Sequence, residues 1–294
     1  MLGEVAVGGI AVGEVAVVAV GGHESANGAA LPGLLGPGVT SVACGRQLQR
    51  AVTALSRSGA GRVCVVPMTL GRDGELAAHT ARTLLALPAA ERARVVLTEG
   101  FGTARHLTGW LRAAAARVPA EAALLVTAPA GDPYDDAELY RIARLVWQYG
   151  QHRIVEVALV GGDPDLDHGL ARCRVLGAAR TVALPASFVL PPVPGVTPLL
   201  SAPAAAGVLA ARIGTALERL RTHGDDGLAT GLTAADEHGT AHSHADGHPH
   251  GRSHGHGHSR SHGHAPAQVH APAPAPTPSP AAAPAPAPSP SPVS

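Results

Sequence analysis

Residues 15–25, VAVVAVGGHES, bring a histidine to a position where it could do chemistry. The valine-rich run predicts a strand that is buried on both faces, as the strands of parallel sheets are. Gly21 and Gly22 then allow a sharp turn, so His23 is expected just beyond the carboxyl end of this strand. Ligands bind at that edge of open α/β sheets, and a neutral imidazole there can bind a metal ion or accept a proton. The alternative interpretation is a loop histidine that only caps the next helix.

The elements that must position His23 follow from the pattern of apolar residues. Short apolar runs predict strands, and apolar residues at helical spacing predict helices between them. The expected strands span residues 15–20, 39–43, 62–67, 94–98, 123–127, 155–160 and 181–185. Asp73 is expected to cap one helix, and Asp163-Pro164 to open another. This alternation predicts an α/β fold built on doubly wound parallel sheets.

The same order of elements occurs twice. The segments GAGRVCVVP at 59–67 and GAARTVALP at 177–185 each contain a helix end and then a strand that ends in proline. The repeat predicts two tandem halves, 14–120 and 121–221, after an N-terminal extension at 1–13. A last helix near 204–221 is assigned to the second half. Because the second half has no histidine that matches His23, we expect one active site, carried by the first half.

Residues 222–294 differ in composition from the rest of the chain. They contain 12 of the 17 histidines, many alternating with glycine or serine, and a Pro/Ala/Ser-rich stretch from residue 265. Such a composition buries too little apolar surface to fold, which predicts a disordered tail. Imidazoles in a flexible chain can converge on a metal ion, so His254, His256 and His258 are candidate accessory metal ligands.

Composition excludes several other functions. The chain has 22 basic and 22 acidic residues and no lysine, so its zero formal charge argues against a nucleic-acid partner. Three cysteines without a CxxC pair fit a reducing cytoplasm. Glu4 and Glu14 interrupt the apolar N-terminus, which argues against a signal peptide and a membrane partner. A cytoplasmic protein is therefore expected, and its oligomeric state stays open.

Several motifs along residues 14–221 resemble the class II chelatases of tetrapyrrole synthesis, and among them the long, two-half cobaltochelatases of cobalamin biosynthesis. They are GGHES at 21–25, VVPMTLG at 65–71, DDAELYRIAR at 135–144 and VEVAL at 155–159. The resemblance implies insertion of a divalent cation into sirohydrochlorin without ATP or a prosthetic group. Co²⁺ is the expected metal substrate, with Fe²⁺ or Ni²⁺ as alternatives. The resemblance also places His23 at the first active-site histidine of the family. Two pyrrole protons must leave as the metal enters, and an imidazole suits that step.

The sequence departs from the family pattern at the second histidine. The family has a histidine eight residues after the strand-ending proline and an aspartate four residues later, whereas this chain has Glu75 and then His79. The two side chains are expected one helical turn apart on a common face, where they could bind a divalent cation together with His23. Alternatively, Glu75 only favours the positive helix N-terminus, and His79 is a half-exposed helix residue.

The implied substrate is a tetrapyrrole that carries several carboxylates. In a chain without lysine, arginine or backbone N–H groups must bind them. Arg46, Arg72 and Arg105 lie near expected loop ends and are candidates, because guanidinium groups pair with carboxylates bidentately. The alternative is that each is an ordinary surface arginine.

Three functions stay open from the sequence. The first is the metal insertion just described, and the second is non-catalytic binding or delivery of cobalt or nickel by a protein with a chelatase fold. The altered position of the second histidine keeps that alternative open. The third is iron insertion for sirohaem. General affinity orders for metals do not choose between them.

Overall fold

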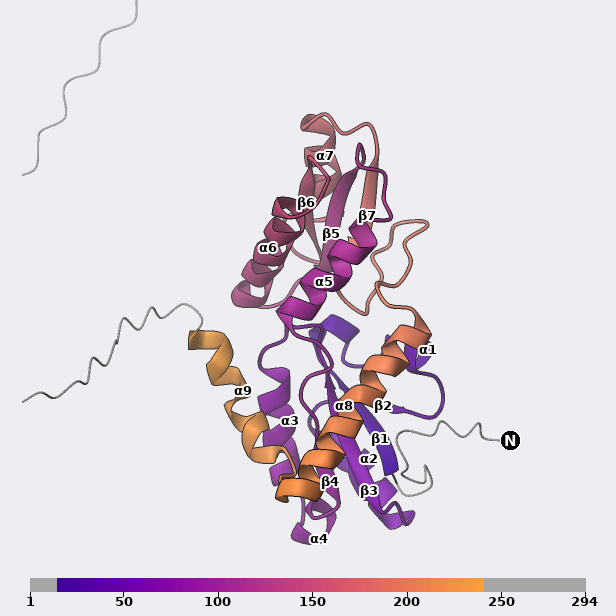
Figure 1. Cartoon of the computed structure of the whole chain (residues 1–294), viewed down its shortest axis with the longest axis vertical. Coiled ribbons are helices and arrows are strands. Elements are labelled where there is room, and N and C mark those ends of the chain that lie inside the picture. The colour runs from indigo at the N-terminus through magenta and orange to yellow at the C-terminus, as the bar shows by residue number, and fades with distance from the viewer. Residues whose placement is uncertain (1–14, 241–294) are drawn as a thin grey trace, which may run out of the picture. The chain divides into compact units, whose positions relative to one another are not determined.

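The first sheet contains four parallel strands in a computed structural model that describes residues 15–240 and the side chains of residues 15–234 (Figure 1). The strands are β1 (Val15–Gly21), β2 (Thr40–Ala43), β3 (Arg62–Met68) and β4 (Val95–Leu97), in the order β2-β1-β3-β4. β3 is buried after its first residue and β1 is buried from Val18 to Gly21, as their valine-rich sequences predict. The expected extension at 1–13 lies outside the described residues.

The second sheet repeats part of this arrangement. Its strands are β5 (Ala123–Pro129), β6 (Val155–Val160) and β7 (Thr181–Pro185), all parallel and in the order β6-β5-β7. β3 and β7 hold the repeated sequence segments; β3 is an inner strand beside β1, and β7 is an edge strand beside β5. Pro67 pairs with Val20 of β1, and Pro185 pairs with Thr127 of β5. The α/β class with two parallel sheets is therefore confirmed.

Helices connect the strands in the expected alternation. They are α1 (Pro32–Leu35), α2 (Arg46–Arg57), α3 (Leu76–Leu85), α4 (Ala89–Arg92), α5 (Ala104–Ala115), α6 (Pro133–Gln148), α7 (Leu166–Val175), α8 (Ala202–His223) and α9 (Leu228–Thr240), with a short 3₁₀ turn, η1 (His23–Ser25). Two helix starts correct the expectation. The cap of α3 is Glu75, not Asp73, and α7 begins after Asp163-Pro164, where the Asp165 side chain accepts a hydrogen bond from the His168 N–H.

The position of α8 corrects its assignment to the second half. The helix packs on β3 and β4, and Arg212 of α8 forms an ion pair with Glu99 beyond β4. Arg219 donates a hydrogen bond to the Leu97 carbonyl, so α8 also fixes the outer strand of the first sheet. The long helix after β7 therefore returns to the first half. The apolar stripe of α8 predicts that one face of the helix is buried, but it does not predict which sheet that face packs on.

Helix α9 corrects the expected start of the disordered tail at residue 222. α9 packs on α3, and Leu228 is buried in the core of the first half. The Leu97 N–H donates to the Asp226 carbonyl just before α9, and Gly231 lies against Leu97 and Ala81. Gly227 and Gly231 both lie close to Leu97, so α9 docks through its backbone with little apolar side-chain surface. Its sequence therefore shows no strong apolar period. Residues 241–294 lie outside the described part.

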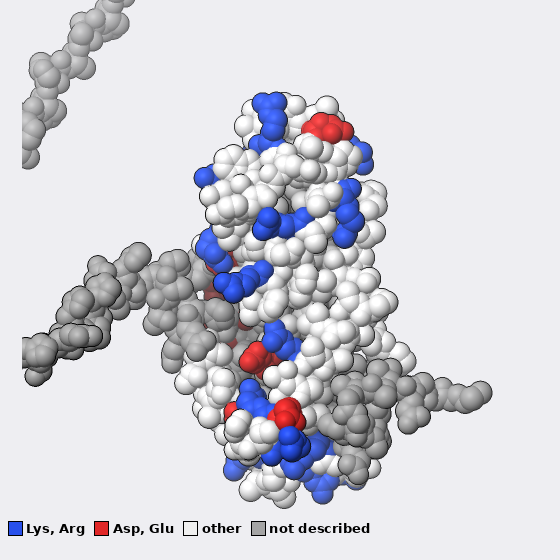
Figure 2. All heavy atoms as spheres, viewed as in Figure 1, with Lys and Arg blue, Asp and Glu red and all other residues white. Residues whose placement is uncertain are grey.

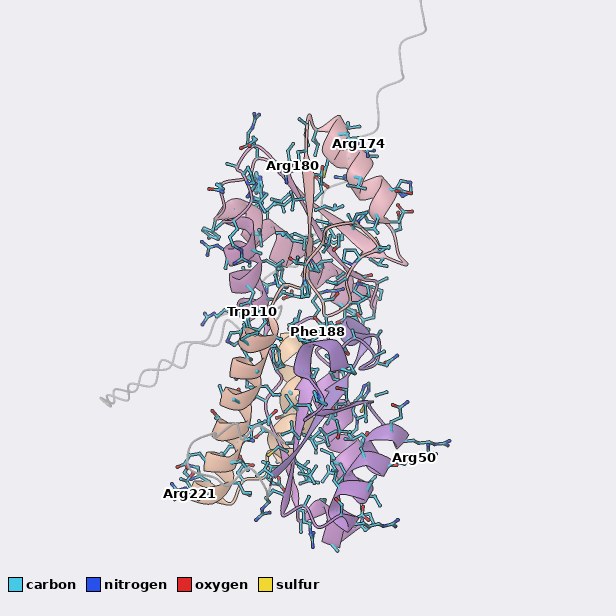
Figure 3. All side chains as sticks on the ribbon, turned by 90° about the vertical axis from the view of Figure 1, so that its right-hand side faces the viewer. Arg50, Trp110, Arg174, Arg180, Phe188 and Arg221 are labelled. Carbon is cyan, nitrogen blue, oxygen red and sulfur yellow. The ribbon has the colours of Figure 1, made fainter. Side chains whose placement is uncertain are left out.

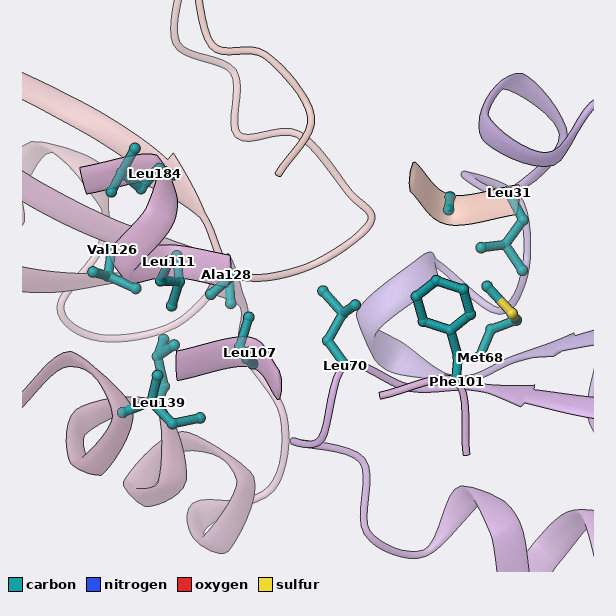
Figure 4. Packing of buried hydrophobic residues seen from close by; sticks show 14 of the residues in the cluster. Leu31, Met68, Leu70, Phe101, Leu107, Leu111, Val126, Ala128, Leu139 and Leu184 are labelled. Carbon is teal, nitrogen blue, oxygen red and sulfur yellow. The ribbon is translucent and has the colours of Figure 1, made fainter. Parts of the chain in front are cut away.

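A buried apolar cluster joins the two halves. Met68, Leu70 and Phe101 from the first half belong to the same cluster as Val126 and Leu139 from the second (Figure 4). Residues 15–240 accordingly belong to one unit. The shared core places the carboxyl edges of β1, β3 and β5 so that side chains from both halves can meet.

Candidate active site

His23 lies where the sequence predicts, two residues after the carboxyl end of β1 and at the start of η1. Its Nδ1 atom is 3.3 Å from Oδ2 of Asp73 and 3.6 Å from Oδ2 of Asp135. The His23 side chain is 23% exposed, so the group is partly shielded from water. This arrangement makes His23 more than a helix-capping loop residue, because two carboxylates face one ring nitrogen.

The two carboxylates come from different halves. Asp73 lies in the loop after β3, and Asp135 lies in the first turn of α6, after β5. Three strand ends thus converge on one imidazole, as expected for ligand sites at the carboxyl edge of parallel sheets. DDAELYRIAR contains Asp135, but only the fold shows that this residue faces His23. The signal that could have pointed to it was an acidic first turn directly after a buried strand.

Two glycines allow this close approach. A Cβ atom on Gly22 would collide with the Asp73 carboxylate. A Cβ atom on Gly131 would lie 2.9 Å from Cβ of Asp135 and 3.2 Å from Nε2 of His23. The backbone of both halves therefore packs directly against the ionisable groups, which shields them partly from water.

Burial and charge shift the pKa values in this cluster. Burial lowers the pKa of His23, but the hydrogen bond with Asp73 and the charges of Asp73, Glu24 and Asp135 raise it above its usual value. Burial raises the pKa of Asp135 to about 6, although the neighbouring His23 works against this shift. Perturbed groups at a strand edge are typical of functional sites.

Glu24 is a buried acid that the sequence interpretation missed. It is fully buried, and its Oε2 accepts hydrogen bonds from Thr69 Oγ1 at 2.5 Å and from the Leu70 N–H at 2.9 Å. Its carbonyl accepts a hydrogen bond from the Phe188 N–H, so the residue links β1, β3 and the loop after β7. Burial raises the pKa of Glu24. Its position beside Gly-Gly-His was the only available signal.

Arg72 corrects a predicted substrate contact. Its side chain is fully buried, and it forms an ion pair with Asp136 at 3.1 Å. It also donates to the carbonyls of Asp135, at 3.2 Å, and Pro129, at 3.4 Å. The guanidinium group is buried and already bound to Asp136 and to two carbonyl groups of the second half. A substrate carboxylate therefore cannot reach it. Arg72 is neither a surface arginine nor an accessible anion site.

Glu75 and His79 lie one turn apart on α3, as expected, and both are exposed. The Glu75 carboxylate contacts Arg82 at 3.4 Å, whereas the residues that contact His23 are Asp73 and Asp135. Within residues 15–234, no three or more His, Cys, Asp or Glu side chains are grouped to hold a metal ion. The structure does not bring Glu75 and His79 together with His23.

The other candidate residues lie apart from this cluster. Arg46 begins α2 and Arg105 lies in the first turn of α5, both exposed. His106 stacks on Trp110 with a ring separation of 5.7 Å. Arginine side chains are spread over the face shown in Figure 2, with a few acidic ones between them. His254, His256 and His258 lie outside the described residues.

A cavity of about 910 Å³ lies beside Glu24. Leu70 and Phe188, whose backbone N–H groups bind Glu24, both line it. Trp110 adds an aromatic face, and Phe188 and Trp110 lie near the level where the halves meet (Figure 3). Arg117 is the one charged residue among the lining residues described. The cavity has the size of a small-molecule site with a mostly apolar wall.

Comparison with known proteins gives a partial match. A sirohydrochlorin cobaltochelatase of Priestia megaterium is 41% identical over 70 residues, which are 23% of this chain and 23% of that protein. The chain therefore matches about a quarter of that relative's length. No protein-family model matches the chain. The two parallel α/β sheets are consistent with a class II chelatase. In residues 15–240, no helix is both long and apolar enough to cross a membrane.

Proposed function

We propose that this protein inserts a divalent cation, Co²⁺ above all, into sirohydrochlorin, with His23 as the catalytic residue. The observation that carries the proposal is the imidazole of His23 at the carboxyl edge of β1, held between carboxylates of both halves. The partial similarity to a sirohydrochlorin cobaltochelatase supports the substrate class. Both the cation and the macrocycle are substrates, and the reaction as proposed needs no prosthetic group.

The chemistry requires a base and a charge partner. The cation replaces two pyrrole N–H protons of the macrocycle, so two protons must leave for each metal that enters. An imidazole can hold the incoming cation or accept a proton, but one proton at a time. The carboxylates of Asp73 and Asp135 stabilise positive charge on the ring, because opposite charges within about 4 Å favour the charged form. Glu75 and His79 at the exposed start of α3 remain a proposed binding point for the cation outside the His23 cluster.

The macrocycle needs a flat, partly apolar surface near His23. We assign it to the cavity beside Glu24, where Leu70, Phe188 and Trp110 can cover the tetrapyrrole face. Arg117 is available to one substrate carboxylate in that cavity, and Arg46 and Arg105 are proposed for others. A Trp147→Phe variant leaves Trp110 as the sole tryptophan. Sirohydrochlorin should quench its fluorescence in a saturable way, and no quenching would remove the macrocycle from this cavity.

The direct test is an insertion assay with purified protein. Sirohydrochlorin is mixed with Co²⁺, Fe²⁺ or Ni²⁺, and the absorption spectrum is followed against a reaction without protein. We expect protein-dependent formation of the cobalt product and no formation by His23→Ala. Preference for Fe²⁺ would indicate the sirohaem branch. Metal binding without insertion of any of the three would contradict the enzyme and favour a delivery protein.

A further inference from the structure

The starts of β5 and β6 border a groove that lies away from His23. The groove encloses about 600 Å³ and is lined by residues of α6, α7 and the edge strand β6. Ala123, Ala143 and Val157 form its buried floor. Among the described residues, it shares no lining residue with the cavity beside Glu24. The groove is therefore a separate feature of the second half.

The rim of this groove exposes large apolar side chains. Tyr140 and Trp147 of α6 are 46% and 39% exposed, and Leu176 at the end of α7 is 54% exposed. Trp147 is held in place, because its Nε1–H donates to the Arg153 carbonyl at 3.1 Å. The Arg144 guanidinium carbon lies 4.2 Å from the centre of the Trp147 ring. Trp, Tyr and Arg carry much of the binding energy of protein interfaces, so this rim is suited to a protein partner.

The edge of the second sheet is open beside this rim. The Leu124 N–H of β5 donates to the Ile154 carbonyl at 3.0 Å, so the N–H and C=O groups of Val155 face away from β5. No residue in the described part of the chain forms a hydrogen bond with them. The edge strand β4 of the first sheet differs, because its Leu97 N–H donates to the Asp226 carbonyl. An open edge beside an apolar rim favours association with another chain.

The charges at the two ends of β6 indicate which chain fits this edge. Arg144 and Arg153 lie near the start of β6, and neither forms an ion pair with a described residue. Asp163 and Asp165 follow the carboxyl end of β6 and are 94% and 53% exposed, and their ion-pair partner is the exposed His168. The start of β6 is thus basic and its end is acidic. When a two-fold axis lies beside an edge strand, the two copies of that strand run antiparallel, so each basic end faces an acidic end.

We propose that this groove is a dimer interface, in which a second copy of this chain binds across β6. A two-fold interface must be complementary to itself. The apolar rim meets this requirement, because it packs against its own copy, and the charged ends meet it through their opposite signs. Glu156 beside Val155 is already paired with Arg172 at 3.0 Å, so it brings no unpaired charge to the axis. The dimer does not depend on the reaction proposed for His23.

The test is sedimentation velocity of the full chain over a dilution series. We expect the parent protein to form dimers, and Leu176→Asp to raise the Kd of the dimer about tenfold or more, because it places a charge in the apolar rim. Leu85→Asp is the matched control, since Leu85 is a 38% exposed leucine at the end of α3. Thermal unfolding checks that both variants are folded. A monomeric parent protein, or an equal rise in Kd for the two variants, would overturn the proposal.

Charge reversal tests the antiparallel arrangement. Arg153→Glu and Asp163→Arg should each weaken the dimer, because like charges then face each other. The double variant should recover most of the parent affinity, and a double variant weaker than both single variants would overturn the two-fold arrangement. The sedimentation result stands apart from the insertion assay. A parent protein that forms the dimer but inserts no metal would contradict only the proposed function.

Discussion

The ends of β1 and β5 occupy equivalent places in the two sheets, yet they carry different chemistry. β1 continues through Gly21 and Gly22 to His23, whereas β5 continues through Gly131 to Asp135 in α6. Both ends meet at Nδ1 of His23, where the first half supplies the imidazole and the second half a carboxylate. The comparison shows that a repeated sheet need not repeat a site. Each half can contribute a different part of one site.

The largest expected effect removes the contribution of the first half. His23→Ala should lower metal insertion by at least about 100-fold, the usual range for loss of an acid–base group. The fold should persist, because His23 lies in a loop and contributes little apolar packing. The measurement is the rate of the cobalt-dependent spectral change. His168→Ala on α7, an exposed histidine of the second half, is the control and should keep full activity. Near-parent activity of His23→Ala would show that the site lies elsewhere.

The next effect breaks the connection between the halves. Arg72→Met removes a buried cation and leaves Asp136 without its ion-pair partner. Loss of one member of a buried pair costs about 3–5 kcal/mol, so the free energy of unfolding should fall by that amount. Urea unfolding measures it. Arg82→Met removes an exposed pair with Glu75 and should cost no more than about 1 kcal/mol. Equal costs for the two variants would contradict the role of Arg72.

A smaller effect tests the return of the C-terminal helices to the first half. A Cβ atom on Gly231 of α9 would lie 2.5 Å from Leu97 and 3.1 Å from Ala81. Gly231→Val should therefore destabilise the first half by about 1–3 kcal/mol through overpacking. Gly214→Val on α8 is the control, because a Cβ atom there meets no atom within 4 Å. If urea unfolding gives the same value for both, α9 does not pack on β4 in solution.

A pH effect sharpens the comparison at the shared site. The pKa of Asp135 rises from about 3.8 to about 6 in the folded protein, so between these values the folded state holds a proton that the unfolded chain has released. The free energy of unfolding therefore falls as pH rises through this range. The raised pKa of His23 acts in the same direction above about pH 6.5. Urea unfolding from pH 4 to 6 should show a smaller decrease for Asp135→Asn. An identical pH dependence would mean that Asp135 is not buried.

The smallest effect concerns α3. Glu75 and His79 are exposed and lie outside the His23 contacts. Single alanine variants should change the insertion rate less than about threefold at saturating Co²⁺ and act independently, because residues without shared partners are additive. The rates of Glu75→Ala, His79→Ala and the double variant measure this. Strongly non-additive losses would indicate instead that both residues join His23 in one metal site.

Local sequence specifies much of this protein. The valine-rich runs, the glycines after β1 and the proline-ended repeats determine the strand class, the parallel sheets and the place of His23. They do so because a continuous apolar run is typical of a strand covered on both faces, and a glycine turn depends on local backbone freedom. The stacking of His106 on Trp110 is equally local, since the two residues are one helical turn apart.

Tertiary structure decides the partners. His23 and Asp135 belong to different halves, and Arg72 pairs with a residue 64 positions along the chain. Such contacts depend on how the two sheets approach, and the apolar period of a segment reports only that one of its faces is buried. The same reason explains why α8 was assigned to the second half and why α9 was not predicted. An amphipathic or glycine-containing helix can cover either sheet, and the shared core determines which one it covers.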